Sequence, residues 1–150
     1  MQVTDTTVQQ VVAEVFSTML GIEVVAAPSC RTSSSGTWLA ACIHLTGATS
    51  GSIIVEVPIE FGRRAAAAMF GSDPSALADG EVKDAMGEVA NMVAGALRLA
   101  LPTPNQISLP SVSEGRELSC SVPGSQLALE ACFDVGDTQF RVSLFDRVPK

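Results

Sequence analysis

The spacing of apolar residues changes along this chain, and that change constrains the fold more than any other feature. Helical patterns occupy residues 7–20, 59–70 and 79–101. Alternating patterns occupy residues 37–46, 53–57, 106–109, 117–122, 127–135 and 140–144. A spacing of 3.6 residues predicts a helix with one buried stripe, and alternation predicts a strand with one covered face. We therefore expect an α+β fold, in which helices pack on one face of a largely antiparallel sheet.

Chain length and charge limit the domain count and the class of partner. A chain of 150 residues is long enough for one core, so we predict a single domain over residues 1–150. Nine basic and sixteen acidic side chains give a net charge of −7, which argues against nucleic acid because phosphate contacts need Lys and Arg. The first residues lack the pattern of a signal peptide, and charged residues interrupt every long apolar run. We therefore expect a cytoplasmic protein without a membrane span.

The cysteines and the single histidine show no spacing typical of a metal or redox centre. None of Cys30, Cys42, Cys120 and Cys132 forms a CxxC pair, and a zinc site with His44 would need widely scattered ligands. We expect reduced cysteines in the core or the sheet, a plain strand position for His44, and no metal site. A redox, metal or histidine-dependent nucleophilic site is the less favoured alternative, since no GxSxG-type turn supports it.

The longest predicted helix has an unusual polar face. At 100° per residue, Asp84, Glu88 and Asn91 lie opposite the apolar stripe, so two carboxylates and a carboxamide share one exposed ridge. The same face holds Gly87 and Gly95, and a glycine within a helix costs about 0.5–1 kcal/mol relative to alanine. Small residues let another surface approach closely. The pattern predicts a docking ridge with a projecting acid and amide, and the alternative is a tolerated polar face.

This helix resembles the signature helix of the CheX/CheC-type chemotaxis phosphatases. The resemblance rests on Asp84-x3-Glu88-x2-Asn91 with Met92-Val93-Ala94-Gly95, on residues 51–58 before a helix, and on Ile107-Ser108-Leu109-Pro110 after the signature. Pro110 is the candidate for a downstream proline of the family pattern. The resemblance covers residues 5–146. Because CheC-like members carry two such helices and this chain shows one, the chain is similar to CheX, with a CheX/CheC-like fold.

The resemblance implies an activity, a partner and a role for each ridge residue. The substrate is the aspartyl phosphate of a CheY-like response regulator in two-component or chemotaxis signalling, so the chain is a hydrolase. Asn91 orients the attacking water, since an amide donates and accepts hydrogen bonds without changing charge. Glu88 pairs with the regulator's lysine, and Asp84, Gly87 and Gly95 support docking. The regulator brings Mg²⁺, so the chain has no cofactor of its own, and it forms a homodimer joined at strand edges.

Two other function classes stay open at this point. The same fold family includes flagellar-switch and chemotaxis adaptors, so the chain is alternatively a module that binds a regulator without dephosphorylating it. Retention of both Glu88 and Asn91 favours catalysis. A small-molecule or thiol-dependent enzyme built on His44 and a cysteine is the least favoured class. Loss of activity on alkylation would favour that enzyme, whereas affinity that survives Asn91→Ala without any phosphatase activity would favour the adaptor.

Overall fold

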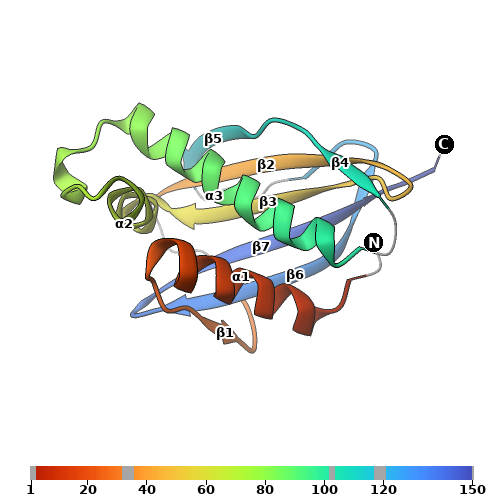
Figure 1. Cartoon of the computed structure of the whole chain (residues 1–150), viewed down its shortest axis with the longest axis horizontal. Coiled ribbons are helices and arrows are strands. Elements are labelled where there is room, and N and C mark those ends of the chain that lie inside the picture. The colour runs from red at the N-terminus through yellow and green to blue at the C-terminus, as the bar shows by residue number, and fades with distance from the viewer. Residues whose placement is uncertain (1–2, 32–35, 102–103, 117–120, 150) are drawn as a thin grey trace.

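The computed structural model describes residues 3–31, 36–101, 104–116 and 121–149, in which three α-helices cover one face of a seven-stranded antiparallel sheet (Figure 1). The helices are α1 (Asp5–Leu20), α2 (Ile59–Phe70) and α3 (Asp79–Leu99), with a short 3-10 turn, η1 (Pro74–Ala76). The strands are β1 (Val25–Ala27), β2 (Thr37–Gly47), β3 (Gly51–Pro58), β4 (Asn105–Ile107), β5 (Ser111–Arg116), β6 (Ser125–Val135) and β7 (Thr138–Arg147). The predicted α+β class is confirmed. None of these helices is long and apolar enough to cross a membrane.

The sheet is built from two hairpins that meet at its centre. The strand order is β1-β6-β7-β3-β2-β4, and β5 also pairs with β2. Hairpins β2–β3 and β6–β7 meet where β3 pairs with β7. Strands β4 and β5 both pair with β2, β4 along Leu45–Gly47 and β5 along Thr37–Cys42. The connection between them, residues 108–110, therefore lies beside β2 at one edge of the sheet.

The core lies between the helices and the sheet. The predicted apolar stripe of α3 is confirmed, because its main members are at most 2% exposed: Val82, Met86, Val89, Val93 and Leu97. A chain of aromatic contacts, with ring centroids 4.9 to 5.8 Å apart, joins α1 and α2 to β6 and β7 through Phe16, Phe61, Phe133 and Phe140. Because the apolar stripe of α3 is buried in this core, the opposite face of the helix is turned toward solvent.

Several predicted boundaries differ from the structure; α3, for example, ends at Leu99 rather than at residue 101. The helix expected from residue 7 begins at Asp5, because the side chain of Thr4 accepts a hydrogen bond from the Thr7 N–H (3.2 Å) and caps the helix there. Strand β5 was not predicted, since its mostly polar residues show no apolar alternation. Of the strand expected over 117–122, residues 117–120 lie outside the described part, and residues 121 and 122 belong to no strand.

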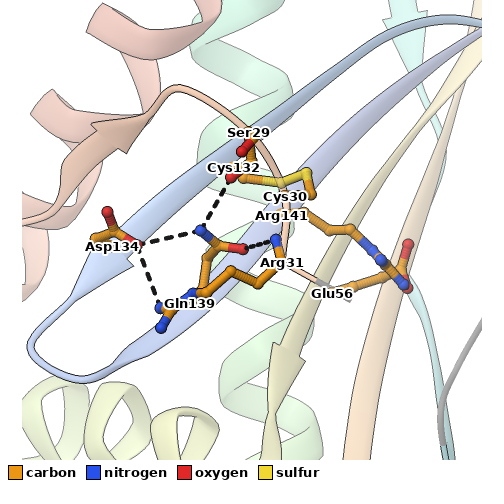
Figure 2. The surroundings of a disulfide bond; sticks show 8 residues. All are labelled: Ser29, Cys30, Arg31, Glu56, Cys132, Asp134, Gln139 and Arg141. Carbon is orange, nitrogen blue, oxygen red and sulfur yellow. Dashed lines mark hydrogen bonds and ion pairs between the residues drawn. A yellow bond between two sulfur atoms is a disulfide. The ribbon is translucent and has the colours of Figure 1, made fainter. Parts of the chain in front are cut away.

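The cysteines also differ from the prediction. Cys30, just after β1, forms a disulfide with Cys132 of β6, with the two Cα atoms 5.3 Å apart (Figure 2). Cys42 in β2 is a free thiol, and burial raises its pKa; Cys120 lies outside the described residues. The expectation of reduced cysteines is therefore wrong for Cys30 and Cys132. Local spacing could not reveal the bond, because 102 residues separate its two ends and the β1–β6 ladder brings them together.

Candidate functional site

The N-terminal end of α3 is fixed by its first-turn carboxylates. The Glu81 carboxylate accepts a hydrogen bond from the Ala78 N–H (3.0 Å), which closes the start of the helix. Asp79, the first helical residue, forms an ion pair with Arg63 of α2. Negative charge at this end also interacts favourably with the helix dipole. These contacts set where α3 begins and support the orientation that its apolar stripe imposes.

The predicted polar residues lie along the solvent side of α3. Asp84 and Glu88 are exposed, and Asn91 and Gly95 are half-buried. Residues three or four positions apart share one helix face, so these four residues form a line that we call the α3 ridge. Within the described part of the chain, the side chains of Asp84, Glu88 and Asn91 have no hydrogen bond or ion pair. Their polar ends are therefore free to bind a partner.

Gly87, in contrast, is buried beneath the chain's own β4–β5 connection. A Cβ at this position would lie 3.2 Å from Cγ of Pro110 and 3.5 Å from Cγ2 of Val112. At Gly95 a Cβ would meet no atom within 4 Å. The expectation that Gly87 lies open to a docking partner is therefore wrong, and Gly95 remains open. The helical pattern missed this difference because β5 packs against the flank of α3, a contact that only the tertiary structure creates.

A groove of about 340 Å³ runs between α3 and β5, beside the α3 ridge. Its walls are Lys83, Asp84, Gly87, Glu88, Pro110 and Val112. Lys83 forms an ion pair with Glu114 of β5 (3.9 Å), which adds a polar link between the two elements. The groove therefore places an apolar wall from the β5 side directly next to the Glu88 carboxylate. Of these six residues, the sequence pointed to Asp84, Gly87, Glu88 and Pro110, but it held no signal for Lys83 or Val112.

The shape of the β4–β5 connection depends on Ser108. Its N–H donates to the His44 carbonyl oxygen (2.9 Å), and its Oγ accepts from the His44 N–H (2.9 Å). Ser108 Oγ also donates to the Leu109 carbonyl oxygen (3.0 Å). The next two residues leave the regular ladder, so that Pro110 packs on Gly87 and Leu109 is 90% exposed. The connection thus extends the surface around the groove with an exposed apolar side chain.

The other candidate groups lie on the opposite side of the sheet from the helices. Nδ1 of His44 is 2.8 Å from Oγ of Ser52, on the face of β2 that does not contribute to the main core. Cys30, Glu130 and Cys132 have ligand atoms within 4.8 Å of one another, but the two sulfurs are joined in the disulfide. Neither group shares a surface with the α3 ridge.

Comparison with known proteins identifies the family. The family model described as chemotaxis phosphatase CheX matches residues 39–134, more than half of the chain. The chain therefore belongs to the CheX family of chemotaxis phosphatases, as the resemblance predicted. No protein of curated function matches the chain.

Solved structures of the same fold cover nearly the whole chain. The chemotaxis protein CheX of Desulfovibrio desulfuricans is 28% identical, with a TM-score of 0.75 over 93% of this chain and 95% of that one. CheX of Vibrio vulnificus is 20% identical, with a TM-score of 0.78 over 94% and 95%. The structure of a CheX–CheY–BeF3–Mg²⁺ complex from Borrelia burgdorferi gives 22% identity and a TM-score of 0.70 over 95% and 96%. The CheX/CheC-like fold is thereby confirmed.

Proposed function

We propose that this chain hydrolyses the aspartyl phosphate of a CheY-like response regulator. The observation that carries the proposal is the placement of Glu88 and Asn91 on one solvent-facing line of α3, in a member of the CheX family. The Borrelia burgdorferi structure, of the same fold, is a complex of CheX with CheY, BeF3 and Mg²⁺. That complex supports a CheY-like regulator as the partner of this chain.

In this proposal Asn91 positions the attacking water. Its amide accepts one hydrogen bond from the water and donates another toward the phosphoryl oxygens without changing charge. The water oxygen attacks phosphorus in line with the bond to the regulator's aspartate. That bond breaks, the aspartate leaves as a carboxylate, and inorganic phosphate is released with a proton. Mg²⁺ held by the regulator neutralises phosphoryl charge, so the chain itself contributes mainly positioning.

Glu88 sets the register in which the two proteins dock. It lies three residues before Asn91 on the same face, and its carboxylate pairs with the lysine of the regulator's active site. Exclusion of water at the interface strengthens such a pair. Asp84 adds negative charge one turn further along the α3 ridge, and Gly95 leaves space for the partner's surface beyond Asn91.

We also propose a homodimer that is joined at an edge of the sheet. Strand β1 is only three residues long and ends the sheet on one side, while β4 and β5 lie at the other. Unpaired strand edges favour pairing with another chain. Sedimentation at micromolar concentration is expected to give a dimer, and a monomer would contradict this part of the proposal. A single domain over residues 1–150 and a cytoplasmic location stay predictions.

The decisive experiment follows the decay of phosphate on a purified receiver domain of the CheY type. The wild-type protein is expected to accelerate the decay, and Asn91→Ala to abolish most of the acceleration while binding persists. Gln10→Ala is the matched control, because Gln10 is an exposed amide on α1, a different helix from the one that carries the α3 ridge. Equal rates for wild type and Asn91→Ala contradict the catalytic role. Binding by a wild-type protein that never accelerates decay identifies the adaptor instead.

A further inference from the structure

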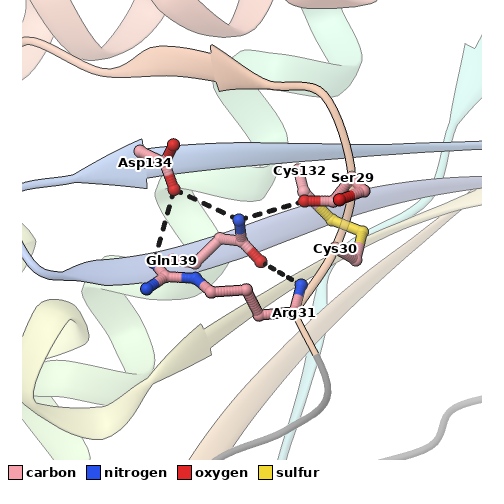
Figure 3. Close-up of polar contacts among 6 residues, drawn as sticks. All are labelled: Ser29, Cys30, Arg31, Cys132, Asp134 and Gln139. Atoms are coloured by element: carbon pink, nitrogen blue, oxygen red, sulfur yellow. Dashed lines mark hydrogen bonds and ion pairs between the residues drawn. A yellow bond between two sulfur atoms is a disulfide. The ribbon is translucent and has the colours of Figure 1, made fainter.

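The segment after β1 is fastened to the sheet on the face that the helices leave uncovered. We call the described part of this segment, Pro28 to Arg31, the crossover, because it lies on the path from β1 at one edge of the sheet to β2 near the other (Figure 1). The Arg31 N–H donates to Oε1 of Gln139 (2.8 Å), and Nε2 of Gln139 donates to the Ser29 carbonyl oxygen (3.2 Å). Gln139 of β7 thus binds the crossover backbone at two points (Figure 3).

Asp134 of β6 adds further polar contacts to the crossover. Its Oδ1 accepts a hydrogen bond from Nε2 of Gln139 (3.1 Å) and pairs with the Arg31 guanidinium (3.3 Å). In Figure 3 these contacts lie next to the Cys30–Cys132 disulfide. The crossover is therefore held in two ways, by one covalent bond and by a set of polar contacts. These polar contacts hold Ser29 and Arg31, the residues on either side of Cys30, against β6 and β7.

The two sulfur-bearing residues differ in their access to solvent. Cys132 is 4% exposed, whereas Cys30 is half-buried and its neighbours in the crossover are exposed. Arg141, the cross-strand partner of Cys132, forms an ion pair with the buried Glu56 (2.7 Å) on the same face (Figure 2). No residue of the crossover belongs to the main hydrophobic core. The crossover can therefore detach while the core stays packed, and a reagent in solution reaches Cys30 first.

We propose that Cys30 and Cys132 form a reversible thiol–disulfide exchange site, which reacts with small thiols and disulfides of the glutathione class through Cys30. The oxidised site locks the crossover onto β6, and the reduced site leaves it held by Gln139 and Asp134 alone. Because the proposal rests on the cysteine pair and its surroundings, it does not depend on any activity of the α3 ridge.

The exchange proceeds in two balanced steps. The Cys30 thiolate attacks one sulfur of glutathione disulfide, which forms a mixed disulfide and releases one glutathione thiolate. The Cys132 thiolate then attacks Sγ of Cys30, which closes the protein disulfide and releases the second glutathione thiolate. The two protein thiols lose two electrons in total, one glutathione disulfide gains them, and the two thiol protons pass to the released thiolates. Reduction by a dithiol runs the same sequence backwards, beginning with attack on Cys30.

The first test measures reversibility in the folded protein. A Cys42→Ala, Cys120→Ala background leaves only the proposed pair, which is opened with dithiothreitol, closed with glutathione disulfide, and followed by alkylation and mass spectrometry. Complete opening and closing without denaturant is expected, and hydrogen exchange in peptides that contain the crossover should be about tenfold faster in the reduced form. The rate of hydrogen exchange in peptides from α3 should be the same in the oxidised and reduced forms. A disulfide that opens only after unfolding, or thiols that do not close again, would overturn the proposal.

The second test assigns the exchanging sulfur. Glutathione disulfide should modify Cys30 in Cys132→Ser about tenfold faster than Cys132 in Cys30→Ser, because access governs the rate. Gln139→Ala should slow closure of the disulfide about fivefold, since the polar contacts then no longer hold the two thiols in reach. Equal modification rates in the two serine variants, or unchanged closure in Gln139→Ala, would contradict these assignments. Circular dichroism confirms that each variant is folded.

A third measurement separates exchange from metal binding. The reduced protein is titrated with Zn²⁺ alone, since Glu130 lies near both cysteines. If the pair is a thiol–disulfide exchange site, glutathione disulfide should still close the bond in the presence of Zn²⁺. The proposal is overturned if the reduced protein binds one Zn²⁺ ion, if this ion blocks closure of the disulfide, and if Glu130→Gln abolishes the binding. The pair would then be a metal site.

Discussion

The α3 ridge and the crossover are both polar surfaces, but their side chains are used in opposite ways. In the described structure, Asp84, Glu88 and Asn91 have no partner within the chain, whereas Gln139, Asp134 and Arg31 at the crossover bind one another or the backbone. Polar groups that already have partners hold a segment in place. Polar groups without partners on a helix are free for another molecule, so the two surfaces differ in whether their polar side chains are already bound within the chain.

The largest expected effect is on stability and comes from the crossover. Loss of the disulfide in Cys30→Ser should lower the free energy of unfolding by about 3–5 kcal/mol, because the bond closes a loop of 102 residues in the unfolded chain. Urea denaturation of the oxidised wild type and the variant measures this difference. The regulator's phosphate should decay equally fast with both folded proteins, and a large loss of activity would remove the distinction between the two regions.

The next effect is on catalysis. Asn91→Ala should slow hydrolysis of the regulator's phosphate about 100-fold at saturating protein, the usual scale for removing a positioned hydrogen-bonding group. Because the Asn91 side chain is only half-buried and lies on the surface of α3, the free energy of unfolding of the variant protein should change little. Single-turnover decay of the regulator's phosphate measures the rate of hydrolysis, and urea denaturation measures the free energy of unfolding. A variant that loses stability rather than activity would show that Asn91 maintains the fold.

Gly87 and Gly95 provide a matched pair within one helix. Gly87→Val should lower stability by about 1–3 kcal/mol, because the larger side chain forces Pro110 and Val112 away from α3. Gly95→Ala should instead raise stability by about 0.5–1 kcal/mol, since alanine favours the helix and the added methyl group meets no atom. Thermal or urea denaturation of both variants measures these changes in stability. Equal losses in both would refute the difference in packing.

A smaller effect is expected in regulator binding. Glu88→Gln should weaken binding about tenfold, or about 1.4 kcal/mol, through the loss of one charged pair. The remaining affinity should depend less on salt concentration than that of the wild type. Glu60→Gln is the control, because Glu60 is an exposed carboxylate on α2. Titrations at several ionic strengths measure both quantities, and equal weakening by the two variants would argue against a specific role for Glu88.

The smallest effect concerns the reactivity of Cys42. Burial raises the pKa of this thiol, so the reactive thiolate forms at higher pH than in an exposed cysteine. Alkylation of Cys42 near pH 8 should therefore be about threefold or more slower than that of Cys30 in the reduced protein, and it should accelerate as the pH rises further. Mass spectrometry of the alkylated peptides measures both rates. A Cys42 that reacts as fast as Cys30 would contradict the effect of burial on the pKa of Cys42.

Sequence periodicity predicted most of the fold and the position of the ridge. The α2 boundaries, the alternation in β2 and β3 and the apolar stripe of α3 follow from the local spacing of apolar residues. Asp84, Glu88 and Asn91 lie within two turns of one helix, so their common face is a property of helix geometry alone. Those features were predictable because each depends on residues that are close in the chain.

Packing between distant elements decided the rest. The burial of Gly87 depends on Pro110, and the disulfide joins residues that the β1–β6 ladder brings together. The groove beside Glu88 and the exposed Leu109 likewise depend on the path of the β4–β5 connection along β2. The sequence by itself determined which residues share a helix or strand face, because backbone geometry repeats locally. Only the tertiary structure decided which of those faces stay open to solvent, because that depends on where other elements of the chain pack.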